Sequence, residues 1–195
     1  MVFSRRKTGA LAAALLASAF VPRDAQAKRC EDVAMPDEVS VDGKKLVLNG
    51  MGVREATVFN VNVYVAGLYL EKRSNDGPRI AAAEEIKRID LAFVREVSRE
   101  DMTEAIHKGF EKSAGAEFAK LKPRVEKFKA LLPEFKVGDR LTLTYRPGSG
   151  LSVVAPGKKG NVEGADFARA LFLIWLGAHP PNEGLKRGLL GGACG

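Results

Sequence analysis

The sequence predicts an α+β domain in which an antiparallel sheet carries helices on one face. The main expected elements follow in the order hairpin, strand, two helices, second hairpin and helix, with short helical pieces at 80–87 and 185–190, and no repeating strand–helix–strand unit occurs among them. Such an order is typical of antiparallel sheets whose helices gather on one side. Residues 28–195 are long enough to bury one hydrophobic core, so we predict a single domain over that range.

The stretch from Leu46 to Glu71 predicts the first hairpin. Residues 46–49 form a short apolar strand, residues 50–52 a glycine-rich turn, and residues 58–70 a long strand rich in β-branched and aromatic side chains. The first half of the long strand alternates apolar and polar residues, whereas both sets are apolar from Tyr64 onward. This pattern predicts a second layer over only part of the strand, with room for a cavity where that cover begins.

Arg54 lies between the expected turn and the long strand, beside that predicted cavity. Its guanidinium stays charged and offers a fork of N–H donors that suits a carboxylate or another oxyanion. Glu55 is the nearest acidic residue, but adjacent side chains on an extended chain point to opposite faces. Arg54 is therefore the first candidate for a ligand-binding residue.

The other elements follow from hydrophobic periodicity and from turn residues. Ser98 followed by Asp101 marks a helix start, and Pro123 is expected to kink a later helix or to begin a new one. The helix at 166–177 is nearly all apolar and should be the most buried one. The full set comprises a helix at 80–87, a strand at 88–94, helices at 98–110 and 118–132, a hairpin at 140–154, and helices at 166–177 and 185–190.

Residues 1–27 have the pattern of a secretory signal peptide. A basic segment at 5–7 precedes an uncharged apolar run at 10–21 and an Ala-Gln-Ala cleavage site at 25–27. The apolar run is short for a membrane span, and it is removed with the leader. We therefore expect no transmembrane segment in the mature chain. Thr8 and Gly9 depart from the twin-arginine signal and favour general secretion. The mature protein, beginning at Lys28, is then expected in the periplasm or outside the cell.

Processing also lowers the net charge. The leader contains four of the 31 basic and one of the 24 acidic residues, so the net charge falls from +7 to +4. No nucleic-acid-binding motif accompanies this modest balance, and we expect no nucleic-acid partner. The sequence shows no cluster of metal-ligating residues, and the glycines at 157 and 160 do not match the spacing of a phosphate-binding loop, so we expect neither a metal nor a cofactor.

The two cysteines, Cys30 and Cys194, lie near opposite ends of the mature chain. An even number of cysteines in an oxidising compartment favours a disulfide, and chain termini often lie close together. Two unpaired thiols in loose tails are the alternative.

Two segments resemble the chalcone isomerase superfamily, and most closely its bacterial chalcone-isomerase-like proteins. They are Leu48-Asn49-Gly50-Met51-Gly52-Val53-Arg54 and Tyr64-Val65-Ala66-Gly67-Leu68-Tyr69-Leu70, with Trp175-Leu176-Gly177 and Leu185-Lys186-Arg187 in support near the C-terminus. The resemblance covers roughly Val41 to Gly191. It implies an open-faced antiparallel sheet with helices packed on one face and an apolar ligand held between them beside an arginine.

The resemblance also places the ligand-binding positions. They fall at Arg54, Tyr64, Met102, Gly109 and Asn182. In the enzymes of the superfamily the arginine stabilises a phenolate during ring closure, and the other positions carry threonine, tyrosine, asparagine and threonine or serine. Met102 and Gly109 cannot donate the same hydrogen bonds, which argues against efficient isomerisation of a flavonoid-like substrate.

Three functions follow from these residues. The first is binding of a small lipophilic, fatty-acid-like molecule, with Arg54 and the Tyr64 hydroxyl as the anchor. The second is an intramolecular lyase of the chalcone–flavanone isomerase type, in which Arg54 is catalytic. The third is a structural or partner-binding role in the cell envelope.

Overall fold

The computed structural model describes residue 1, residues 27–56 and residues 61–194. Its main sheet has seven antiparallel strands, and each strand lies beside its neighbours in the chain. The strands are β3 (Glu38–Val41), β4 (Lys44–Ala56), β5 (Val61–Leu70), β6 (Lys87–Phe93), β7 (Arg140–Arg146), β8 (Gly150–Ala155) and β9 (Lys158–Val162). The predicted α+β class with an antiparallel sheet is confirmed.

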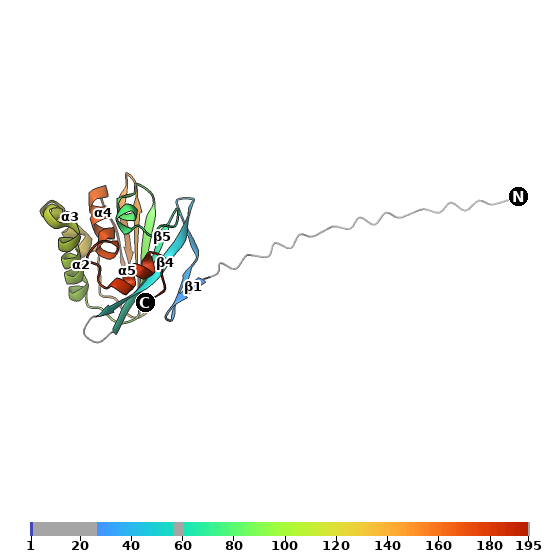
Figure 1. Cartoon of the computed structure of the whole chain (residues 1–195), viewed down its shortest axis with the longest axis horizontal. Helices are drawn as coiled ribbons and strands as arrows, with labels where there is room; N and C mark the ends of the chain where they lie inside the picture. The colour runs from blue at the N-terminus through green and yellow to red at the C-terminus, as the bar shows by residue number, and fades with distance from the viewer. Residues whose placement is uncertain (2–26, 57–60, 195) are drawn as a thin grey trace.

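The helices lie on one side of this sheet (Figure 1). They are α1 (Gly77–Ala82), α2 (Arg99–Ala114), α3 (Phe118–Ala130), α4 (Ala165–Leu176) and α5 (Glu183–Leu189), with a short 3-10 turn, η1, at Gly115–Glu117. Ser98 caps α2 as expected, because its hydroxyl accepts a hydrogen bond of 3.0 Å from the Asp101 N–H. Pro123 lies inside α3, and α4 buries most of its length.

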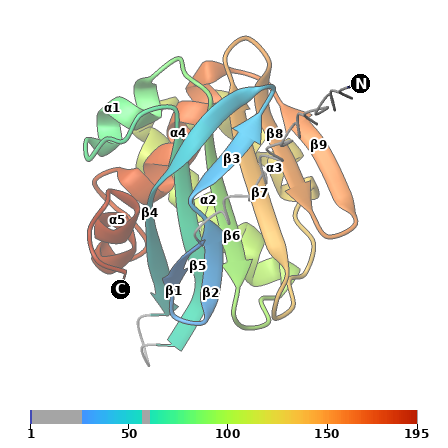
Figure 2. The same ribbon diagram turned by 90° about the vertical axis from the view of Figure 1, so that its right-hand side faces the viewer.

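The opposite face of the sheet is partly covered by a hairpin that the sequence analysis missed. Strands β1 (Ala27–Cys30) and β2 (Val33–Pro36) pair with each other and lie across the sheet (Figure 2). The Met35 side chain fills the space above Gly67, and the Tyr69 hydroxyl donates to the Pro36 carbonyl oxygen over 3.1 Å. The later half of β5 is apolar on both faces because the helices cover one face and the β1–β2 hairpin covers the other. The predicted leader, apart from Met1 and Ala27, lies outside the described residues.

The glycines of the Gly50-Met51-Gly52 segment have a different role from the one expected. They lie inside strand β4 and not in a turn. A Cβ atom at Gly50 would overlap the Gly188 carbonyl oxygen, and one at Gly52 would overlap the Leu185 carbonyl oxygen. The missing side chains therefore allow α5 to lie directly on the strand.

Asn49 also holds α5 against β4, through side-chain hydrogen bonds. Its buried amide nitrogen donates to the carbonyl oxygens of Leu189 (2.8 Å) and Ser74 (2.9 Å), and its oxygen accepts from the Ser74 N–H (2.8 Å). One side chain thus joins β4 to the end of α5 and to the loop before α1. The Leu-Asn-Gly motif supports the frame around the site and does not itself line the cavity described below.

The structure joins Cys30 to Cys194 in a disulfide across a sequence separation of 164 residues. Their Cα atoms are 5.6 Å apart. The bridge ties the buried end of β1 to the segment after α5, and therefore holds the hairpin and the last helix to the same edge of the domain.

Candidate functional site

A cavity of about 500 Å³ opens between α2, the end of α4 and the adjoining ends of β4 and β5. Apolar side chains make up most of its wall, namely Val63, Val97, Met102, Ala105, Ile106, Ile174 and Trp175. The segment His179-Pro180-Pro181 closes one side. The size and the lining are those of a site for a small, largely apolar molecule.

Arg54 lines this cavity from strand β4. The predicted turn at Arg54 is wrong, because β4 continues to Ala56. Gly50, Gly52 and Arg54 pair with Leu68, Ala66 and Tyr64 of β5, so all three point to the helix-covered face. The two glycines lie beneath α5, and Arg54 is the next residue of the same row and lines the cavity.

One guanidinium nitrogen of Arg54, Nη1, is buried and has no hydrogen-bond partner among the described residues. A buried N–H donor without an acceptor is costly, and the cost is larger when the group is charged. The register is also irregular at this point, since a bulge separates the Arg54–Tyr64 pair from the next pair. Bulges often redirect side chains beside functional sites. The geometry therefore leaves a charged donor facing an apolar cavity.

Tyr64 stands directly opposite Arg54 on β5 and also lines the cavity. Its hydroxyl oxygen accepts a hydrogen bond of 3.0 Å from Trp175 Nε1 on α4. Burial raises the pKa of Tyr64, whereas the Trp175 hydrogen bond and the Arg54 charge act in the opposite direction with smaller effect. Tyr64 is therefore neutral at physiological pH and keeps its hydroxyl hydrogen.

Met102 and Gly109 line the cavity from α2, seven residues apart on one face of the helix. Met102 is buried, and a Cβ atom at Gly109 would approach Ile174 Cγ2 to 2.9 Å. Gly109 thus allows α2 and α4 to pack closely along the cavity. Neither residue supplies a polar side chain to the cavity.

Asn182 does not line the cavity, although its neighbour Pro181 does. Its amide nitrogen donates to the Val53 carbonyl oxygen over 3.0 Å, and its amide oxygen accepts from the Glu55 N–H over 3.4 Å. These two bonds hold the backbone on both sides of Arg54. A direct contact between Asn182 and a ligand stays a prediction.

Trp175 is the cavity residue that the sequence analysis undervalued. Trp175 lies in the apolar segment 166–177 that was predicted to form the most buried helix, and the structure leaves it 1% exposed. Its indole N–H nevertheless reaches Tyr64 at the cavity wall. The Trp175-Leu176-Gly177 motif was the only sequence signal for this residue, because apolar periodicity does not distinguish a cavity wall from a filled core.

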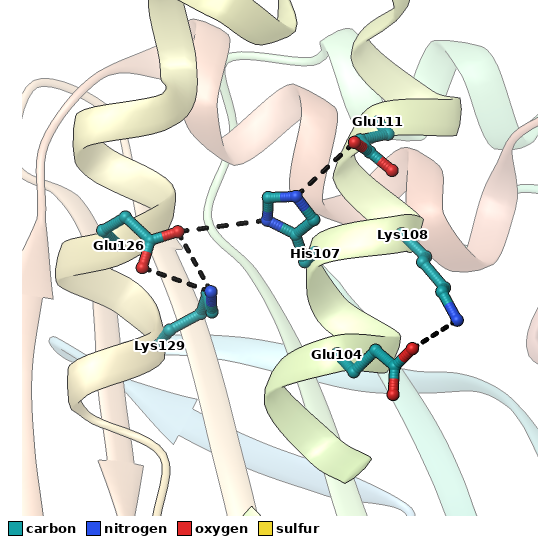
Figure 3. A network of polar contacts seen from close by, with 6 residues as sticks. All are labelled: Glu104, His107, Lys108, Glu111, Glu126 and Lys129. Atoms are coloured by element: carbon teal, nitrogen blue, oxygen red, sulfur yellow. Dashed lines mark hydrogen bonds and ion pairs between the residues drawn. The ribbon is translucent and has the colours of Figure 1, made fainter. Parts of the chain in front are cut away.

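Charged residues surround the outer part of the cavity on α2. Glu104 and Lys108 form an exposed ion pair there, and Asp101 and Lys112 also contribute to the lining. His107 belongs to a separate cluster. It lies between Glu111 of α2 and Glu126 of α3, with nitrogen–oxygen distances of 3.5 and 3.9 Å (Figure 3). These contacts connect α2 to α3, and none of the three residues lines the cavity.

Across residues 27–56 and 61–194, no cluster of potential metal ligands is present. None of the described helices is long and apolar enough to span a bilayer.

A sequence profile of the chalcone isomerase-like family matches residues 27–191. The chain therefore belongs to the chalcone isomerase-like family.

The fold is also similar to that of a solved structure, a fatty-acid binding protein of Arabidopsis thaliana. The two chains superpose with a TM-score of 0.66 at 17% sequence identity, and the match covers 82% of this chain and 92% of the plant protein. No curated protein matches the sequence.

Proposed function

We propose that this protein binds a small lipophilic acid, with its carboxylate at Arg54 and Tyr64 and its apolar chain along the α2–α4 wall. The observation that carries the proposal is the buried Arg54 Nη1, which has no acceptor among the described residues. A ligand carboxylate supplies that acceptor, and the neutral Tyr64 hydroxyl supplies a second donor. The fold shared with a fatty-acid binding protein is consistent with this ligand class.

Binding is tested by calorimetric titration of the mature protein with decanoate. Trp175 is the single tryptophan of the chain and lines the cavity, so its fluorescence gives an independent signal. We expect one molecule of decanoate per chain and a change in the Trp175 emission over the same concentration range. Absence of both signals at millimolar decanoate would refute the proposal.

The ring-closing isomerase reaction is expected to be weak or absent. Met102 and Gly109 offer no side-chain donor to a phenolate, and each missing transition-state hydrogen bond costs on the order of 10²–10³ in rate. A chalcone assay should therefore give a kcat/KM well below about 10⁴ M⁻¹s⁻¹, an ordinary value for enzymes. Turnover above that value would favour the isomerase and reverse the ranking of the two functions.

We also propose that the protein acts after export, in the periplasm or outside the cell. The leader-like pattern of residues 1–27 supports this location, and the Cys30–Cys194 disulfide is compatible with an oxidising compartment. N-terminal sequencing of the protein from its native envelope should begin at Lys28. An intact Met1 chain recovered from the cytoplasm would contradict export.

A further inference from the structure

Two buried side chains meet through a hydrogen bond at the inner end of the cavity. Trp175 is 1% exposed and Tyr64 is 7% exposed, and the indole Nε1 lies 3.0 Å from the phenolic oxygen. The indole N–H can only donate, so the Tyr64 oxygen must be the acceptor in this bond. The hydroxyl hydrogen of Tyr64 is then directed to a different partner.

The neighbouring charged group is also a donor. Arg54 has no acceptor atom in its side chain, and its buried Nη1 has no partner within the described part of the chain. Arg54 and Tyr64 face each other across β4 and β5 on the same side of the sheet. The inner end of the cavity therefore presents N–H and O–H donor groups from two strands. The Tyr64 hydroxyl oxygen already accepts a hydrogen bond from Trp175.

We propose that Trp175 is a positioning residue that fixes the Tyr64 hydroxyl as a donor, and so makes the cavity select ionised head groups over uncharged ones. This inference rests on the proposed function. An ionised carboxylate only accepts hydrogen bonds and fits a set of donors. An alcohol of the same length carries no charge and brings a further O–H donor into that set.

The test compares the binding affinity for decanoate with that for 1-decanol in four proteins. They are the wild type, Trp175→Phe, Tyr64→Phe and the double variant. Trp175→Phe should lower decanoate affinity about tenfold, less than the loss of a whole hydrogen bond to a charged group, because the Tyr64 hydroxyl remains but is then free to rotate. Its effect on 1-decanol should be much smaller. The wild-type preference for the acid should therefore fall in this variant.

The double variant separates positioning from packing. If Trp175 acts through Tyr64, then Trp175→Phe should cause no further loss of decanoate affinity in the Tyr64→Phe background. Equal losses for acid and alcohol, or a full tenfold loss in the Tyr64→Phe background, would mean that Trp175 only fills space and would overturn the inference.

A ligand-free measurement covers the case in which Trp175→Phe does not fold. The single indole N–H gives one nitrogen–proton NMR resonance. Tyr64→Phe should shift this resonance and speed its exchange with solvent hydrogen, and an unchanged resonance would overturn the inference. Failure of the wild type to bind decanoate would refute the proposed function itself, whereas binding that is unaffected by Trp175→Phe would refute only the role of Trp175.

Discussion

Replacing Arg54 with alanine should weaken decanoate binding by roughly 2–5 kcal/mol, which is about 30-fold to several-thousand-fold in Kd. The loss is large because the variant removes the charged partner of a carboxylate in a cavity with mostly apolar walls. Arg54→Lys should recover only part of the affinity, since a lysine cannot make the two parallel hydrogen bonds of a guanidinium. Calorimetric titration of the wild type and both variants measures the series.

Arg169 offers a matched control for this experiment. It is an exposed arginine on α4 and is not part of the cavity, so Arg169→Ala changes the net charge equally but leaves the site intact. Its Kd for decanoate should equal that of the wild type. Equal affinities in wild type, Arg54→Ala and Arg54→Lys would show that Arg54 is not the anchor.

Replacing both cysteines with serine should lower the free energy of unfolding by about 2–5 kcal/mol. The bridge closes a loop with a sequence separation of 164 residues, and it restricts the unfolded chain as well as holding β1 to the segment after α5. Urea unfolding of the wild type and of the Cys30→Ser/Cys194→Ser variant measures the difference.

Thiol titration of the denatured, unreduced wild type is the control for the disulfide. It should detect no reactive thiol in the wild type. Two reactive thiols per chain would rule out the bridge, and an unchanged unfolding midpoint in the double serine variant would show that it contributes no stability.

The sequence predicted strands β4 to β8 and most helices because their signals are local, whereas β3 and β9 at the two ends of the main sheet were not predicted. Alternating residues in β6 and β7, the Ser98 cap of α2 and the apolar length of α4 each identify an element without knowledge of its neighbours. The hairpin of β1 and β2 lacked such a signal. Its strands are four residues each, and the match between Met35 and Gly67 exists only after folding.

The candidate site was predicted only in part, because some of its features depend on contacts that form only after folding. Arg54 was selected as a charge next to an apolar strand, but the glycines before it were read as a turn. Glycine permits both a turn and a close approach of backbones, and only α5 lying on β4 decides between them. The hydrogen bond between Trp175 and Tyr64 joins residues 111 positions apart in the sequence. A periodic pattern within one element cannot reveal such a contact.

The central claim is that the partly buried guanidinium of Arg54 holds the carboxylate of a lipophilic acid. Native mass spectrometry of the mature protein purified from its host tests this claim without a choice of ligand. We expect the wild type to carry one aliphatic acid per chain, Arg169→Ala to carry the same acid, and Arg54→Ala to lack it. A wild type without any bound acid, or an Arg54→Ala variant that retains it in equal amount, would contradict the account.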